Sequence, residues 1–282
     1  MLASLSILII LLIVCDSIRR FIICQCIKLE IKDTFCQHIL LDVVGAFEMC
    51  SVSLELGVVF KHYGYWYFAI LLYLNILYQC LRWPHIHPPC PYFHIVKFVS
   101  GKSKASLLQV LTRCLILMVS GLSAYHLVST SIWHLELVEQ HVGRIKETSV
   151  EHCSVPGTNE TPLYILILSE FLGVFVLDVI INVGIVNNPF FQNRSPIISS
   201  SIIPGVVVFV VTMAMNISGG MFNPILATVL VGGCNGHSTI EHILIYWIAS
   251  TMGAVLADLA YPRLHRCIYA VSLKPDTEKK KN

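Results

Sequence analysis

The sequence predicts an all-helical membrane protein built from two inverted halves, each with three spanning helices and one helix that crosses only half of the bilayer. Three observations predict this fold: an apolar composition, two short proline-initiated segments inside apolar sequence, and a one-sided distribution of lysine and arginine. Of the 282 residues, 55% are hydrophobic and only 13% are charged. Because soluble domains carry roughly a quarter of charged residues, lipid is the expected solvent.

Five apolar stretches are long enough, or nearly so, to cross the bilayer, which takes about 20 residues in a helix. They are residues 38–60, 63–81, 114–133, 162–186 and 242–257. Two of them, 38–60 and 162–186, also contain carboxylates. Among these carboxylates we expect Glu55 and Asp178 to lie near helix ends, where water can reach them.

Residues 195–240 contain no charged side chain, yet they are too many for one span and too few for two spans and a loop. The sequence Asn-Ile-Ser-Gly-Gly at 216–220 interrupts this stretch, and Asn223-Pro224 then starts a new helix that stops near Gly232. Asparagine is a favourable N-cap, and proline suits the first helical turn. A helix of about ten residues rises ~15 Å, which is half of the hydrocarbon core. This helix is therefore expected to cross half of the membrane.

A second short helix is predicted earlier in the chain. Between Arg82 and Lys102, three prolines prevent a helix until Pro91, which follows Cys90, can begin one. Helix ends at membrane depth are tolerated only where they are buried in protein or line a wet cavity. The two half-membrane helices together predict a pore or a binding site.

The placement of the 19 lysines and arginines sets the orientation. All of them fall on one predicted side except Lys61, Arg144 and Lys146. Cytoplasmic loops carry the excess of positive charge in membrane proteins. The first half-helix loop and the C-terminal tail are therefore expected on the cytosolic side, and the second half-helix is expected to enter from the opposite face.

The first residues form an additional apolar segment. Residues 1–15 are uncharged, and Arg19 and Arg20 follow them. A cleaved signal peptide has its positive charge in front of the apolar core, so this order favours an extra N-terminal anchor helix over a signal peptide.

Specific motifs resemble those of one membrane-protein family. The sequence Ser-Gly-Gly-Met-Phe-Asn-Pro-Ile at 218–225 resembles the second Asn-Pro-Ala loop of the aquaporins, or major intrinsic proteins. Tyr246-Trp247 and Met252-Gly253-Ala254 resemble the last helix of that family. The segments 234–242 and 261–266, and the apolar start that ends at Arg20, resemble the superaquaporin, or unorthodox, branch. The resemblance covers nearly the whole chain and is strongest toward its C-terminus.

The resemblance implies an aquaporin-like bundle of six core transmembrane helices and two half-membrane helices in an inverted repeat. The expected organisation is an N-terminal anchor helix at 1–27, a channel domain at 28–262 and a cytosolic basic tail at 263–282. Within the channel domain, the two repeats cover 38–133 and 162–262. Family members assemble as tetramers, so a homotetramer is expected.

By this resemblance, two tripeptides occupy the Asn-Pro-Ala positions: Cys90-Pro91-Tyr92 and Asn223-Pro224-Ile225. Cys90 replaces an asparagine amide with a weak donor. Tyr92 and Ile225 replace alanines, and they are expected either to narrow the pore or to lock the half-helices together.

The resemblance also places the narrow filter. Leu226 stands where the family normally has an arginine, and Val211 stands where water-selective members have a histidine. The constriction is therefore expected to be apolar, with slow passage of water or a preference for small uncharged solutes such as glycerol or hydrogen peroxide. A pore too occluded to conduct much is the alternative.

Two carboxylates have a role that the family implies. Glu48 and Glu170 lie in the first helix of each half and are expected to accept hydrogen bonds from the half-helix loops. Such bonds would offset the cost of ~2.5–3.5 kcal/mol or more for a charge at mid-membrane depth.

Other classes of function find little support. His85, His87, Cys90 and His94 do not form a convincing metal site, because the first two flank prolines in an irregular loop with no second ligand cluster. We expect no enzyme and no cofactor, since catalytic sets and phosphate-binding loops are absent from the sequence. We also expect no nucleic acid, since no basic stripe with aromatic residues occurs. A secondary transporter or a non-conducting membrane organiser remains as an alternative.

Three further patterns concern covalent links and location. Cys153 and Cys234 fall on the same predicted side and can form a disulfide. Asn159 begins a glycosylation pattern on the predicted outer side. Lys279 and Lys280 form a dilysine pattern at the end of the tail, which predicts retention in the endoplasmic reticulum or another intracellular membrane. The alternatives are a merely solvated basic tail and a plasma-membrane location.

Overall fold

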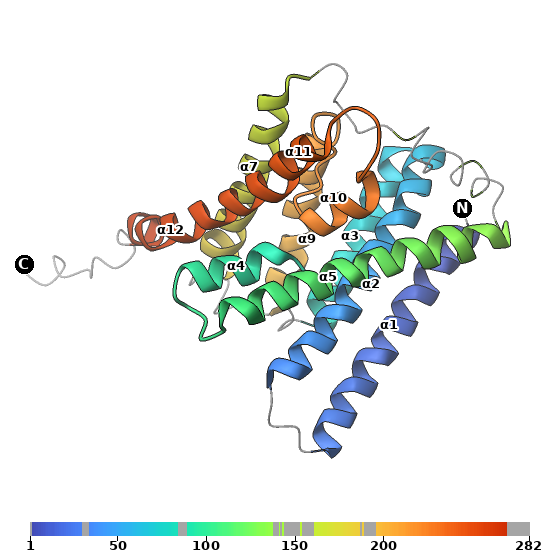
Figure 1. Cartoon of the computed structure of the whole chain (residues 1–282), viewed down its shortest axis with the longest axis horizontal. Coiled ribbons are helices and arrows are strands. Elements are labelled where there is room, and N and C mark those ends of the chain that lie inside the picture. Colours follow the sequence, from blue (N-terminus) through green and yellow to red (C-terminus); the bar gives the residue numbers. More distant parts are fainter. Residues whose placement is uncertain are drawn as a thin grey trace, which may run out of the picture.

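In the computed structural model, the described residues are 2–29, 34–83, 89–137, 141, 143, 153, 161–186, 188 and 196–269. The regular elements within these ranges are helices (Figure 1). The first half comprises α1 (Leu2–Lys28), α2 (Thr34–Tyr63), α3 (Tyr65–Arg82), α4 (Pro91–Val99), α5 (Leu107–Leu127), η1 (Val128–Ile132) and η2 (Trp133–Leu135). The second half comprises α7 (Leu163–Val179), η3 (Ile180–Val186), α9 (Pro196–Ala214), α10 (Pro224–Val231), α11 (Thr239–His242), η4 (Ile243–Ala249) and α12 (Ser250–Tyr269).

The same order of long and short helices occurs twice. In the first half, α2, α3 and α5 are long and α4 is short; in the second half, α7, α9 and α12 are long and α10 is short. The packing repeats as well, because α2 lies against α5 as α7 lies against α12, and α3 meets α9 between the halves. Each short helix lies against long helices of the bundle: α4 against α5 and α12, and α10 against α2 and α5 (Figure 1).

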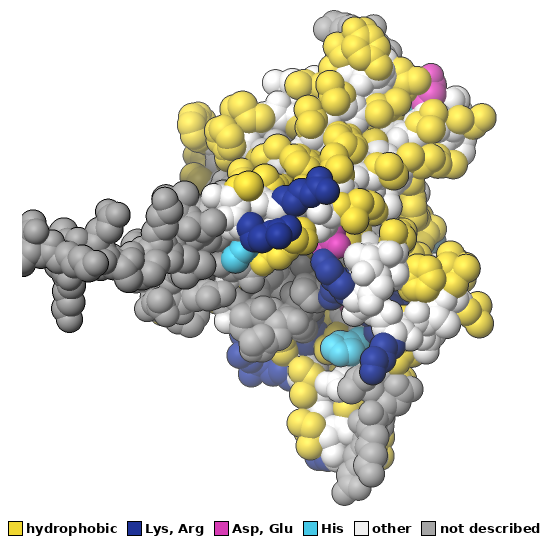
Figure 2. Space-filling model, turned by 90° about the vertical axis from the view of Figure 1, so that its left-hand side faces the viewer, with side chains coloured by type: hydrophobic (Ala, Val, Ile, Leu, Met, Phe, Trp, Pro, Cys, Tyr) yellow, Lys and Arg dark blue, Asp and Glu magenta, His cyan; other side chains and the backbone are white. Residues whose placement is uncertain are grey.

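The outer surface suits a lipid environment. Four of the described helices are long and apolar enough to cross a membrane: Phe35–Tyr63, Leu107–Leu135, Leu163–Val186 and Thr239–Cys267. On α5, exposed apolar side chains recur every three or four residues, which places them in one stripe along the helix. They are Leu108, Leu111, Leu115, Val119 and Leu122. Figure 2 shows one face of the molecule with hydrophobic side chains over its upper part and Lys and Arg gathered across its middle.

The helices extend beyond the apolar runs seen in the sequence. The predicted run at 242–257 becomes a helix from Thr239 to Tyr269, and the run at 114–133 begins already at Leu107. Charged residues that limit the apolar runs are accommodated within the helices: Asp258 pairs with Lys102, and the Arg113 guanidinium lies 4.8 Å from the centre of the Phe35 ring. The helices continue past these residues because partners elsewhere in the chain compensate the charges: Lys102 faces Asp258, and Asp42 Oδ2 lies 3.9 Å from Arg113 Nη1.

The N-terminal helix α1 packs into the bundle along one stripe. Its buried side chains recur every three or four residues, which is the spacing of one helix face. They include Ser4, Leu8, Leu11, Cys15 and Arg19. Leu8 forms an apolar cluster with Val52 and Leu56 of α2, and Figure 1 shows α1 lying alongside α2.

The expectation for Glu55 was wrong. This carboxylate is fully buried in the interior of α2, where it accepts a hydrogen bond from Trp133 Nε1 at 3.3 Å and lies 3.2 Å from His141 Nε2. Two aromatic side chains that follow α5 in the chain thus supply the polar partners that water would provide at a helix end. The expectation for Asp178 was wrong as well: this half-buried carboxylate lies inside the helix, which continues from α7 through η3 to Val186.

The contact between α7 and α12 depends on a glycine. A Cβ atom on Gly253 would lie 2.4 Å from the carbonyl oxygen of Phe171, so any side chain there pushes the two backbones apart. At Gly205, in contrast, an added Cβ meets only the Tyr73 ring at 4.0 Å.

We therefore expect Gly253→Ala to lower the free energy of unfolding by about 1–3 kcal/mol through overpacking. The measurement is the temperature at which the purified protein loses its monodisperse peak in size-exclusion chromatography. Gly205→Ala is the matched control and should leave this temperature almost unchanged. Equal effects of the two variants would contradict the close approach of α7 and α12.

Candidate functional site

The first half-helix begins at the Cys-Pro-Tyr sequence. Cys90 is the N-cap of α4, with extended backbone angles, and Pro91 occupies the first helical turn. The Cys90 thiol makes no capping hydrogen bond, in line with the weak hydrogen bonding of a thiol. The helix has nine residues, which corresponds to a rise of ~14 Å.

The second half-helix begins in the same way with a stronger cap. Asn223 is the N-cap of α10, and its side-chain oxygen accepts a hydrogen bond from the Ile225 backbone N–H at 3.0 Å. Pro224 follows in the first turn, and the helix ends after eight residues at Gly232. Both helices thus begin where the sequence predicts.

The start of the second half-helix touches the residue that precedes the first. Asn223 Nδ2 donates to the carbonyl oxygen of Pro89 at 3.3 Å and to the sulfur of Met49 at 3.2 Å. Pro89 directly precedes Cys90, so the N-terminal ends of the two half-helices meet inside the protein. Asn223 is 8% exposed and Cys90 is 1% exposed. Both N–H donors of the Asn223 amide therefore have protein partners, and neither is free for a passing water molecule.

Glu170 on α7 holds the loop that leads to the second half-helix. Its carboxylate is fully buried and accepts three hydrogen bonds, from the Ser218 hydroxyl at 2.7 Å, from the Met221 N–H at 3.2 Å and from the Phe222 N–H at 2.8 Å. The Tyr246 hydroxyl donates to the Ser218 carbonyl at 2.8 Å and closes the loop from the other side. The loop thereby supplies the hydrogen bonds that the buried Glu170 carboxylate needs, and the carboxylate in turn holds the loop in its shape.

The residue before Asn223 adopts an unusual backbone conformation. Phe222 has φ of 48°, in the left-handed region that non-glycine residues rarely occupy. Its ring fills the space over Gly173, where an added Cβ would lie 1.9 Å from a ring carbon. The Glu170 bonds and the Gly173 pocket together hold Phe222 in this conformation, and they fix the direction in which Asn223 points.

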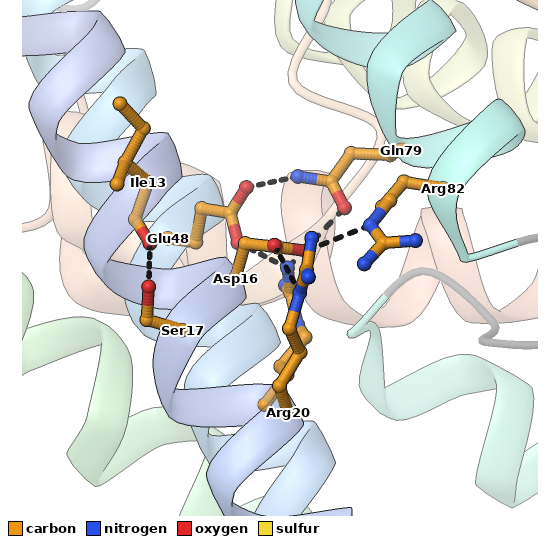
Figure 3. A network of polar contacts seen from close by, with 8 residues as sticks. Ile13, Asp16, Ser17, Arg20, Glu48, Gln79 and Arg82 are labelled. Carbon is orange, nitrogen blue, oxygen red and sulfur yellow. Dashed lines mark hydrogen bonds and ion pairs between the residues drawn. The ribbon is translucent and has the colours of Figure 1, made fainter.

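Glu48 in the first half has different partners. Its Oε2 lies 2.5 Å from Arg19 Nη1 of α1, and its Oε1 accepts a hydrogen bond from Gln79 of α3. Figure 3 shows Glu48 and Gln79 facing each other between the helices. The expected bonds to a half-helix loop are not among the contacts of the described residues, and residues 84–88 of that loop lie outside the described part.

Tyr92 and Ile225 pack into apolar clusters. Tyr92 lies among Val174, Leu177 and Ala254, and Ile225 lies among residues of α2 and α5. The contact of Ile225 with α5 requires Gly121, where an added Cβ would lie 2.6 Å from Ile225. These side chains were expected either to narrow the pore or to lock the half-helices together. Their packing favours the second role, because each holds its half-helix against long helices.

The two predicted filter residues pack against different apolar clusters. Leu226 is half-buried against the cluster that contains Ile225, and half-buried Val211 packs near Phe222. The Val211 carbonyl also closely approaches Gly220, which has φ of 60°.

Of the histidines considered as metal ligands, His94 lies 3.4 Å from the carboxylate of Asp42. Asn159, Lys279, Lys280, His85 and His87 lie outside the described residues.

A disulfide joins Cys153 to Cys234, just beyond the C-terminal end of α10, so the pairing that the sequence allowed is formed. The Asn235 N–H donates to the Cys153 carbonyl at 3.0 Å. Next to this link, His237 Nε2 lies 3.2 Å from His242 Nδ1, and burial lowers the pKa of the His237 imidazole. The disulfide thus anchors the loop after the second half-helix.

Comparison with solved structures identifies the fold. The aquaglyceroporin from Plasmodium falciparum superimposes with a TM-score of 0.60 over 84% of this chain and 100% of its own, at 12% sequence identity. The chain is therefore an all-helical, multi-pass membrane protein with the aquaporin fold, which confirms the predicted fold class.

Sequence comparison points to the same class. The chain is 22% identical to Aquaporin-11 from Milnesium tardigradum over 236 residues, which are 83% of this chain and 79% of that protein. No protein-family model matches the chain. The chain thus shares the aquaporin fold with a solved structure and a distant sequence similarity with one aquaporin.

Several residues of the site escaped the sequence analysis. Arg19 and Gln79 bind Glu48, Met49 and Pro89 bind Asn223, and Gly173 receives Phe222. Only Arg19 left a signal in the sequence, because it falls on the same helix face as the apolar residues of α1. The other contacts join segments that are far apart in the chain.

The three bonds to Glu170 generate a prediction. Glu170→Gln replaces one acceptor oxygen by an NH₂ group that faces backbone donors, so we expect a loss of about 2–5 kcal/mol in the free energy of unfolding. The measurement is the thermal midpoint of the purified protein in detergent.

Glu241→Gln is the control for this experiment. Glu241 belongs to a capping box with Ser238 at the exposed start of α11, and its substitution should shift the midpoint only slightly. A Glu170→Gln midpoint as high as that of the control would show that the loop does not depend on this carboxylate.

Proposed function

We propose that the chain is a passive transmembrane channel for water, small uncharged solutes such as glycerol and hydrogen peroxide, or both, with an atypical pore. The observation that carries the proposal is the meeting of the two half-helix starts through the Asn223–Pro89 hydrogen bond. Helix N-terminal ends carry partial positive charge, and two of them at mid-membrane depth disfavour cations. Neutral solutes are the class of cargo that such a passage admits.

The hydrogen-bonding groups at the N-terminal ends of the two half-helices support slow transport of water. Cys90 offers only a weak donor, and both amide N–H groups of Asn223 are bound to Met49 and Pro89. A permeating water must compete with these protein acceptors for a hydrogen bond. Slow passage of water follows from this competition.

The apolar residues at the filter positions support a preference of the channel for neutral solutes. Leu226 and Val211 bring neither charge nor side-chain hydrogen bonds to the constriction that we assign to them. The superimposing structure is that of an aquaglyceroporin, which makes glycerol the first solute to test beside water.

The finer identity and the setting of the channel are part of the proposal. The motifs of the chain most resemble the superaquaporin branch, within it aquaporin twelve, and we propose a homotetramer in the endoplasmic reticulum or another intracellular membrane, with the plasma membrane as the alternative. The domain limits remain 1–27 for the anchor helix, 28–262 for the channel and 263–282 for the cytosolic tail.

A non-conducting membrane organiser is the second candidate. It is favoured by the near-complete burial of Cys90 and Asn223 and by the full engagement of the Asn223 amide. A secondary transporter also uses broken helices and inverted repeats, but a carrier must alternate between two states. The close packing of Tyr92 and Ile225 against long helices argues against such motion.

The deciding experiment is stopped-flow light scattering on vesicles that contain the purified protein, with empty vesicles as the reference. A channel gives added flux of water, glycerol or peroxide that rises linearly with the gradient. Saturation with increasing solute would instead indicate a carrier. Flux equal to that of empty vesicles for all three solutes would overturn the channel and leave the organiser.

Substitution of Met49 tests the passage at Asn223. Met49→Leu removes the sulfur acceptor at nearly constant volume and frees one amide N–H for water. A competing hydrogen bond is worth about 0.5–1 kcal/mol, so we expect water permeability per protein to rise roughly 2- to 5-fold.

Met118→Leu provides the matched control. Met118 packs against the same apolar cluster as Met49, and among the described residues it has no hydrogen bond to Asn223. Its substitution should leave permeability unchanged. An equal response of both variants would place the path of water away from Asn223.

A further inference from the structure

A buried ion pair joins the N-terminal helix to the first helix of the channel bundle. Arg19 Nη1 of α1 lies 2.5 Å from Glu48 Oε2 of α2, and the two side chains are only 4% and 2% exposed. A charge inside an apolar bundle is tolerated only with a partner, because water cannot solvate it. Glu48 therefore depends on a cation that a different helix supplies.

The contacts continue from α1 and α2 to α3. Gln79 donates to Glu48 Oε1 and accepts from Arg19 at 3.4 Å, and Asp16 of α1 pairs with Arg82 at 3.2 Å. Figure 3 shows Asp16, Glu48, Gln79 and Arg82 converging between the helices. Three helices are thus held together at the end of α3, from which the chain leads to the first half-helix.

Arg19 is also close to the start of the first half-helix. A Cβ atom on Gly45 would lie 3.4 Å from the Pro89 ring and 3.8 Å from Arg19 Nη2, so these two side chains flank the same backbone position. Pro89 in turn accepts the hydrogen bond from Asn223. A short series of contacts therefore runs from α1 to the meeting point of the half-helices.

The two halves of the molecule differ in the partners of their buried carboxylates, Glu48 and Glu170. In the second half, Glu170 binds the half-helix loop directly through two backbone N–H groups and a hydroxyl. In the first half, Arg19 and Gln79 occupy the carboxylate of Glu48. An anchor helix that merely attached the chain to the membrane would need no such contact.

We propose that Arg19 is a positioning residue: it neutralises Glu48 and, through the Gly45–Pro89 contact, holds Cys90 and the start of α4 in place. The N-terminal helix is thereby an integral part of the channel bundle. This role goes beyond the proposed transport function, and it does not require the pore to conduct.

The test uses the full chain with Arg19→Met, Glu48→Gln and the double variant, purified in detergent. Each single variant leaves one buried charge unpaired, so we expect the thermal midpoint to fall by roughly 5–15 °C. The double variant removes both charges and should regain at least half of that loss. Arg19→Lys, which keeps the charge, should lie between Arg19→Met and the wild type.

Accessibility of Cys90 gives a local readout. N-ethylmaleimide labelling below the midpoint, mapped by peptide mass spectrometry, should modify Cys90 at least about 5-fold faster in Arg19→Met than in the wild type, since a local opening of ~1 kcal/mol corresponds to that factor. Labelling of Cys50, buried between α2 and α5, serves as the internal control and should stay constant.

Arg20→Met is the matched substitution one residue further along α1. The Arg20 side chain is 60% exposed and pairs only with Asp16 of its own helix among its described partners, so the midpoint and Cys90 labelling should remain those of the wild type. The proposal is overturned if Arg19→Met behaves like Arg20→Met or if the single effects simply add in the double variant. It is also overturned if the thermal midpoint of the double variant is no higher than that of Arg19→Met.

Discussion

A half-membrane helix leaves its first N–H groups and the loop before it without water, and the protein must supply their partners. Glu170 meets this requirement for α10, because one buried carboxylate accepts from Ser218, Met221 and Phe222 at once. The rest of the site follows from it. Phe222 is held in a left-handed conformation over Gly173, and Asn223 is thereby directed toward Pro89.

In the first half, the corresponding carboxylate has a partner from outside the repeat. Glu48 pairs with Arg19 of α1, and removal of one partner from a buried pair costs about 3–5 kcal/mol in measured cases. Among the described residues, the repeat is therefore preserved in the order of its helices, whereas Glu48 and Glu170 have different polar partners.

The sequence was sufficient to predict the architecture and the starts of both half-helices. Proline at 91 and 224, the Asn223 cap and the placement of lysine and arginine act through local chemistry, which a sequence displays directly. The partners of Glu48 and the burial of Glu55 against Trp133 and His141 could not be predicted, because tertiary packing brings these side chains together. The same holds for Gly173, since a glycine that accepts a distant ring looks like any other glycine in a helix.

The covalent bond between Cys153 and Cys234 carries information about sidedness. Thiols of cytosolic proteins are kept reduced, whereas the lumen of the secretory pathway and the cell exterior are oxidising. The end of the molecule beside α10 is therefore expected on the lumenal or external side. Charge placement in the sequence independently predicts the same side for this end, with the opposite face toward the cytosol.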